Sequence, residues 1–120
     1  MNIEAFIEYA ERVINDLQPG ELIEISGRRI LYVGVDSKGG PGMPGVREPL
    51  FTTEAPEKPP KFIYLRPKSL FPESAFKEDD IQTGFGGSVQ VGWINSEEYT
   101  KLGRADLEAR SKAVQELYKD

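Results

Sequence analysis

The stretch Gly39-Gly40-Pro41-Gly42-Met43-Pro44-Gly45 follows a strand-like run, Ile30–Val35, and decides which fold the chain can adopt. Three of its glycines match the G-x-G-x-x-G spacing of a dinucleotide-binding turn, which must open a helix whose N-terminus receives the pyrophosphate. Proline inside the stretch and again at Pro49 removes backbone donors and clashes with a preceding helical turn. The stretch therefore predicts an irregular loop and excludes a nucleotide-binding strand–turn–helix unit here.

On both sides of this loop the hydrophobic pattern predicts an α+β fold. Residues 3–17 carry apolar side chains at helical spacing, between an N-cap at Asn2 and a stop at Pro19-Gly20. Residues 21–26 and 29–35 predict a hairpin. Further strands are expected at 61–66 and 88–94, a short edge strand at 50–53, and helices at 97–102 and 104–119. Because no helix separates the strands, we expect a small antiparallel, curved or barrel-like sheet of about four to five strands, flanked by an N-terminal and a C-terminal helix.

The chain of 120 residues suits a single domain, 1–120, with a long Gly/Pro-rich loop at 36–60. This connection holds four of the twelve glycines and six of the nine prolines. Loops longer than about 12–15 residues are usually functional or disordered. The connection is therefore expected to be an arm, a flap or a disordered excursion. Met43 is expected to be exposed within it. Phe51 and Trp93 are candidates for interface anchors, although core packing is the ordinary explanation for both.

The composition excludes several kinds of chemistry. The chain has no cysteine and no histidine, which removes disulfides, thiolate nucleophiles, Cys/His zinc sites and imidazole general bases. The net charge of −5 disfavours non-specific binding to nucleic acid or an anionic membrane. The N-terminus is acidic, unlike a signal peptide, and no apolar run reaches the roughly 20 residues of a membrane span. A cytoplasmic protein is expected.

The remaining candidates for chemistry are carboxylates and one basic segment. The acidic run Glu78-Asp79-Asp80 lacks the spacing of a calcium loop. With no complete catalytic or metal-binding motif in the sequence, no catalytic residue, metal ligand or cofactor is predicted. The segment 58–68 is locally basic, and Phe62 and Tyr64 alternate onto one strand face within it. Such a face resembles a stacking platform for single-stranded nucleic acid, although core aromatics beside solvated lysines are the ordinary explanation.

These observations favour a small acidic, non-enzymatic binding or regulatory protein that acts through protein–protein contacts of its long loops. One alternative is a domain that binds a small ligand, nucleotide or phosphate with its two glycine-rich loops, 39–45 and 84–88. A weaker alternative is an acidic inhibitor of a nucleic-acid-binding partner. We expect a protein partner and neither nucleic acid nor membrane, and a homo-oligomer is left open. The residues expected at the interface or ligand site are Gly42, Met43, Arg47, Arg66, Lys68, Phe85, Gly86 and Trp93.

Overall fold

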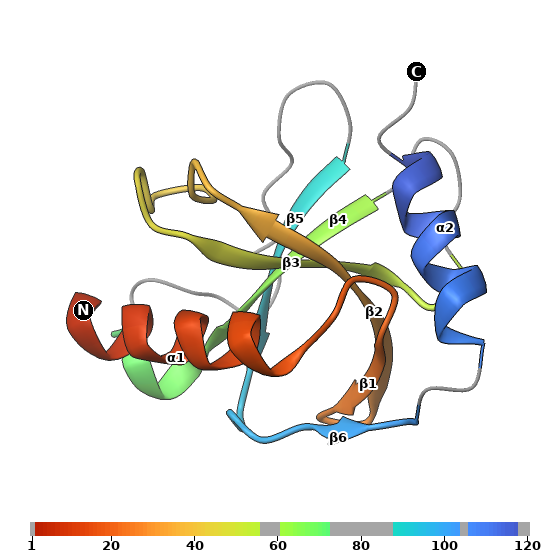
Figure 1. Cartoon of the computed structure of the whole chain (residues 1–120). Helices are drawn as coiled ribbons and strands as arrows, with labels where there is room; N and C mark the ends of the chain where they lie inside the picture. The colour runs from red at the N-terminus through yellow and green to blue at the C-terminus, as the bar shows by residue number, and fades with distance from the viewer. Residues whose placement is uncertain (1, 56–60, 73–87, 104–105, 118–120) are drawn as a thin grey trace.

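The computed structural model describes residues 2–55, 61–72, 88–103 and 106–117 and has an α+β fold (Figure 1). In chain order its elements are α1 (Ile3–Asp16), β1 (Leu22–Ile25), β2 (Arg28–Asp36), β3 (Glu48–Thr53), β4 (Lys61–Pro67), the 3-10 helix η1 (Lys68–Leu70), β5 (Ser88–Ile94), β6 (Thr100–Lys101) and α2 (Leu107–Leu117). The strands of this described part form one open six-stranded sheet in the order β5-β4-β3-β2-β1-β6. The α+β class, the hairpin and the two flanking helices are confirmed, while the sheet has more strands than expected.

The sheet is mixed and not purely antiparallel as expected, because β5 runs parallel to β4. Alternation of side chains along residues 88–94 reveals a strand but carries no information on its direction. A parallel pair needs a crossover of about a dozen residues or more, and the connection from Lys68 to Gly87 is long enough to supply one. The prediction of an antiparallel sheet was therefore wrong at this edge.

The connection from β5 to β6 shows that the sheet is strongly curved. β5 and β6 lie at opposite edges of the sheet, and five spacings across a flat sheet would measure about 24 Å. The chain from Ile94 to Thr100 is six residues long, so it spans at most about 21 Å when fully extended. The two edges must therefore curl toward each other, as the sweep of the strands in Figure 1 also shows.

The two faces of the sheet carry separate hydrophobic clusters. Alternate side chains of β2 illustrate this, because Ile30 and Tyr32 join one cluster while Leu31 and Val33 join the other. α1 packs on the first face, and its buried side chains are Phe6, Tyr9, Ala10 and Val13. Each large side chain buried in this way contributes about 1.5–3 kcal/mol before the loss of entropy. The Asn2 side chain caps α1 by accepting a hydrogen bond from the Ala5 amide, as expected.

α2 lies against the second face, at the opposite end of the molecule from the N-terminus of α1 (Figure 1). Val114 is its buried side chain, and the Arg110 Nε donates a 2.7 Å hydrogen bond to the Gly20 carbonyl. The backbones touch at this point, since a Cβ added at Gly20 would lie 2.6 Å from the Ser111 nitrogen. A glycine at position 20 is therefore required for α2 to dock.

The strand expected at the sheet edge within the 36–60 connection lies in the interior of the sheet. β3 pairs with β2 on one side and with β4 on the other, and Phe51 is buried as expected. Proline usually marks an edge strand, but Pro49 is the second residue of β3, close to the strand end where a missing donor is tolerated. The expected 36–60 loop is therefore interrupted, and its first part is the shorter segment 37–47.

The helix expected over residues 97–102 is absent from the described segment 88–103, and β6 occupies its second half. Ser96 does accept a hydrogen bond at 3.1 Å, but from the Glu98 amide within a single turn. Thr100 and Lys101 pair instead with β1. Isolated helices of this length are marginal, so strand pairing in the tertiary structure overrides the local capping signal.

Candidate functional site

The loop between β2 and β3, residues 37–47, is attached to the sheet at its first residues and is called the anchored loop below. Asp36 at the end of β2 accepts a hydrogen bond from the Tyr64 hydroxyl and another, 2.9 Å long, from the Lys38 amide. Burial of the Tyr64 ring, and next the hydrogen bond to Asp36, raise the pKa of the Tyr64 hydroxyl. The hydroxyl therefore stays protonated and keeps its role as donor.

A buried ion pair lies beneath the anchored loop. The Arg66 guanidinium donates from Nε to Glu48 Oε2 at 2.8 Å and from Nη2 to Glu48 Oε1 at 3.0 Å. The two side chains are 5% and 0% exposed. Because β3 supplies Glu48 and β4 supplies Arg66, adjacent strands position both groups. This parallel two-bond geometry is the strongest form of the arginine–carboxylate contact.

The same ion pair holds the backbone of the anchored loop. The Gly40 amide donates to Glu48 Oε1 at 3.2 Å, and Arg66 Nη1 donates to the Pro41 carbonyl at 2.8 Å. A Cβ at Gly40 would lie 2.8 Å from both Arg66 Nη2 and Glu48 Oε1. A larger residue would have to displace the ion pair, so glycine at this position of the G-x-G-x-x-G match has a structural reason that involves no nucleotide.

Met43 is buried, and the expectation that it is exposed was wrong. Its exposed fraction is 2%, and it belongs to the cluster that α1 covers. Two backbone hydrogen bonds bend the loop around it, from the Met43 amide to the Gly40 carbonyl and from the Gly45 amide to the Lys38 carbonyl, each 3.0 Å long. Glycine and proline neighbours predicted exposure, but these turns direct the side chain into the core.

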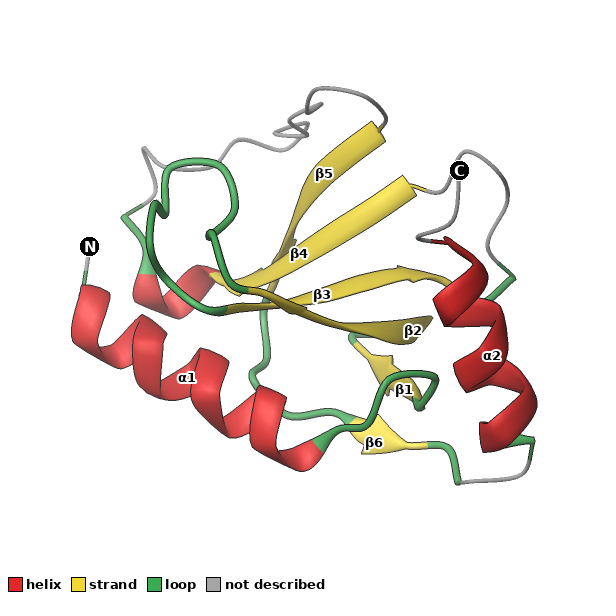
Figure 2. Cartoon of the chain, turned by 45° about the horizontal axis from the view of Figure 1, so that its top comes forward, coloured by secondary structure: helices red, strands yellow, loops and turns green. Residues whose placement is uncertain are grey.

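The far end of the anchored loop is joined to α1. Arg47 Nη1 donates to both carboxylate oxygens of Glu11 at 2.9 Å. Ile3, Ile7 and Glu11 occupy successive i,i+4 positions, so they lie on one side of α1. Ile3 and Ile7 are 40% and 42% exposed. The loop is therefore joined to the middle of α1, one helical turn past Ile7, and Figure 2 shows the loop beside the helix.

The other predicted site residues are dispersed. Gly42 is exposed at the tip of the anchored loop. Lys68 is half-buried in η1, and Trp93 is half-buried in β5, edge-on to Phe71 at 5.0 Å between ring centroids. Arg66 and Trp93 are register partners on adjacent strands. Phe85 and Gly86 lie outside the described residues, as does the acidic run Glu78–Asp80.

The structure describes several side chains on which two of the alternatives depend. Tyr64 is buried and bonded to Asp36, and Phe62 is half-buried, so the β4 aromatics do not form an open stacking platform. The guanidinium groups of Arg47 and Arg66, two of the residues expected at an interface or ligand site, are each engaged by a carboxylate of this chain. The ligand-binding alternative also requires the glycine loop at 84–88, of which residues 84–87 lie outside the described part.

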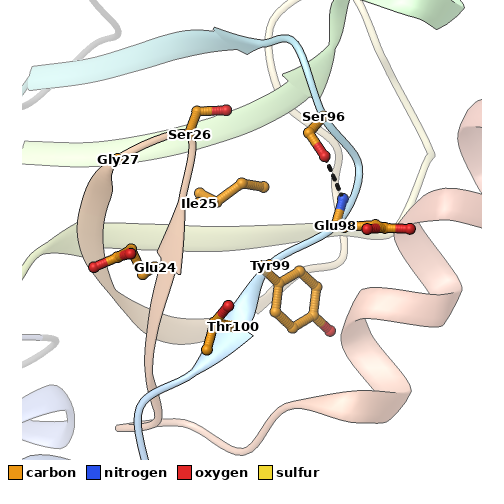
Figure 3. Close-up of a pocket in the computed structure, with 8 residues that line it drawn as sticks. All are labelled: Glu24, Ile25, Ser26, Gly27, Ser96, Glu98, Tyr99 and Thr100. Carbon is orange, nitrogen blue, oxygen red and sulfur yellow. Dashed lines mark hydrogen bonds between the residues drawn. The ribbon is translucent and has the colours of Figure 1, made fainter.

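A separate polar depression of about 330 Å³ lies between the β1–β2 turn and the segment before β6 (Figure 3). Glu24 and Ser26 line one side, and Ser96, Glu98 and Thr100 line the other. These five side chains are all exposed to solvent. The depression is open and lined by oxygen groups that are exposed to solvent, so its described lining does not point to a particular ligand.

A tether beside this depression joins the segment before β6 to the end of α1. The Tyr99 hydroxyl and the Lys101 ammonium both contact the Asp16 carboxylate, the latter at 2.9 Å. The hydrogen bond from Tyr99, and next that from Lys101, lower the pKa of Asp16. Burial, and next the bond to Asp16, raise the pKa of Tyr99. These contacts hold residues 99–101 against the C-terminal end of α1.

No protein-family model matches the chain, and comparison with curated proteins and with solved structures finds no significant match. Within the described ranges, no group of three or more acidic residues is arranged to hold a metal ion. The helices of the same ranges include none that is long and apolar enough to cross a membrane. The candidate for a functional surface is the anchored loop with the side of α1 that Arg47 contacts through Glu11.

Proposed function

We propose that this protein is a non-enzymatic binding or regulatory protein that holds a protein partner through the tip of its anchored loop. Gly42, Pro44 and Gly45 are exposed at this tip, and Arg47 lies at its edge. Met43 and Arg66 act beneath the tip as supports. We place this role in the cytoplasm, and it requires no cofactor.

The observation that supports the proposal is the buried Arg66–Glu48 pair under the loop. The cost of removing two charges from water largely offsets their attraction, so apolar residues of similar shape usually stabilise a fold at least as well. The pair instead fixes the position of the loop, because it forms hydrogen bonds with the loop backbone at Gly40 and Pro41. A loop that is ordered in advance loses less conformational entropy when a partner binds.

The test compares two proline substitutions in affinity capture from a lysate of the source cells. Pro44→Asp places a charge at the loop tip, and Pro19→Asp places the same charge at an exposed position between α1 and β1. A partner retained by the wild-type protein should bind Pro44→Asp about tenfold more weakly, the loss of about 1.4 kcal/mol expected at an interface anchor. Pro19→Asp should bind as the wild type does.

The unfolding midpoint of each variant establishes that the fold is intact before binding is compared. If no protein is retained differently by the wild type and Pro44→Asp, the loop tip is not a protein-binding surface and the proposal fails.

A further inference from the structure

The N-terminal half of α1 carries an exposed surface that packing within this chain does not explain. Ile3 and Ile7 are 40% and 42% exposed and lie one turn apart, so their side chains adjoin. Val35 and Leu102 are the other large apolar side chains exposed to a similar degree in the described ranges, and they lie on different elements. The two isoleucines thus form a small apolar patch on α1, and Ile7 lies one helical turn from Glu11, which Arg47 of the anchored loop contacts.

An acidic row lies next to this patch. Glu4 and Glu8 occupy the neighbouring i,i+4 row of α1, and both are exposed. Glu11 forms an ion pair with Arg47, whereas Glu4 and Glu8 form none with any residue that the structure describes. We call Ile3, Glu4, Ile7 and Glu8 the α1 face.

We propose that the partner docks a basic amphipathic helix on the α1 face, next to the Arg47 end of the anchored loop. This inference rests on the proposed function and specifies the chemistry of the partner. Apolar side chains of the partner helix cover Ile3 and Ile7, and its lysine or arginine side chains meet Glu4 and Glu8. Anchors repeated at three- and four-residue spacing are the usual means by which one helix recognises another.

Charge decides between this partner and a second copy of the chain. A two-fold contact through the α1 face would bring the Glu4 and Glu8 carboxylates of two molecules together, and like charges across an interface are unfavourable. The whole chain carries a net charge of −5, which attracts a basic partner and accelerates its association at low salt. A basic helix is the occupant that satisfies both the apolar and the charged part of the surface.

The experiment is a titration of the isotopically labelled protein with two synthetic peptides, followed by the backbone amide signals in NMR spectra. One peptide of about 18 residues has leucines on one helical face and lysines on its flanks, and the other has glutamate in place of each lysine. The basic peptide should shift the signals of residues 3–11 and 42–47, and binding should weaken as added salt screens the charges. The acidic peptide should cause no such shifts.

Two pairs of matched variants separate local recognition from general attraction. Glu4→Gln/Glu8→Gln should weaken binding of the basic peptide about three- to tenfold. Glu24→Gln/Glu98→Gln removes the same charge at the depression of Figure 3 and should leave binding unchanged.

The apolar patch is tested in the same way. Ile3→Ser/Ile7→Ser should weaken binding of the basic peptide, because the apolar contact on α1 is lost. Val35→Ser/Leu102→Ser removes side chains of similar exposure elsewhere and should not.

Each other outcome overturns the inference. Shifts confined to residues 42–47 with both peptides would reject the helical partner and leave the loop proposal intact. Equal binding of the two peptides, or no binding of either, would also reject it, while lysate capture with Pro44→Asp decides the loop proposal independently. If the amide signals of the α1 face shift when the protein is concentrated without any peptide, a second copy of the chain would be identified as the occupant.

Discussion

The anchored loop is irregular but firmly attached to the core, whereas α2 is a regular helix that is attached less firmly. Regular secondary structure usually goes with the firmer attachment. The loop has no helix or strand, yet Met43 is inserted into the core and a buried ion pair holds its backbone. α2 is a regular helix of 11 residues, and Val114 is its buried side chain. Local unfolding follows the number of buried contacts. We therefore expect α2 to open before the loop does.

The largest effect is expected from breaking the ion pair. Arg66→Met leaves Glu48 buried and without its partner, which should lower the free energy of unfolding by about 3–5 kcal/mol. Arg47→Met breaks the exposed pair with Glu11 and should cost about 1 kcal/mol or less. Urea denaturation of both variants measures the difference, and equal losses would contradict the role given to the buried pair.

A double variant sharpens this result. Glu48→Met/Arg66→Met removes both buried charges, so it should be more stable than Arg66→Met alone. The loop should nevertheless exchange its amide hydrogens faster than in the wild type, because the bonds to Gly40 and Pro41 are gone. Unchanged exchange would show that Met43 alone anchors the loop.

The second effect concerns that side chain. Met43→Ala leaves a cavity in the cluster beneath α1 and should lower the free energy of unfolding by about 2–5 kcal/mol. Pro44→Ala, at the adjacent exposed position, should change it by about 0.5 kcal/mol or less. Thermal or urea unfolding measures both, and a silent Met43→Ala would mean that the loop is not inserted in the core in solution.

The third prediction concerns the docking of α2, for which we expect a smaller loss in the free energy of unfolding. Gly20→Ala introduces a Cβ that would lie 2.6 Å from the Ser111 backbone nitrogen, on a backbone with φ of 95°. Gly103→Ala has nearly the same φ, 91°, and open space around its Cβ, so it shares the backbone strain of about 1–3 kcal/mol but not the clash. Hydrogen exchange in residues 107–117 should accelerate more in Gly20→Ala.

The two substitutions together separate strain from docking. Equal exchange in the two variants would show that the contact at Gly20 does not hold α2 against the sheet.

The smallest effect is expected at the exposed tether between Tyr99 and Asp16. The pKa of Asp16 is lowered from its usual 3.8 by the hydrogen bond from Tyr99, so the tether stabilises the fold above about pH 4 and is lost as the pH falls through the folded-state pKa. Tyr99→Phe should destabilise the protein by roughly 1 kcal/mol or less near pH 7. The difference from the wild type should shrink toward pH 3 in urea unfolding; a constant difference would contradict the linkage.

Local patterns predicted those elements whose cause is local. The stripe of apolar residues over 3–17 predicted α1, and the Gly27 turn between two apolar runs predicted the hairpin. Ser96 also met the local rules for a helix start, and that prediction was wrong because β1 offered Thr100 and Lys101 a pairing edge. A six-residue helix signal is too weak to compete with strand pairing.

The candidate site could be predicted only in outline. The Gly/Pro stretch marked the loop, and Arg47 and Arg66 were singled out from its surroundings. Their partners were missed, although Glu48 stands directly before a buried apolar run, where an unpaired charge would be costly. A charged residue at such a position is the signal that could have indicated a buried ion pair.

The sequence by itself determined the irregular backbone at 39–45, the α+β class and the absence of histidine and cysteine chemistry, because each depends on neighbouring residues or on composition. The tertiary structure alone decided that Met43 points inward, that Arg66 and Glu48 meet, and that Arg47 joins the loop to Glu11 of α1. Those facts depend on residues up to tens of positions apart that the curved sheet brings together. No local pattern records which of them will touch.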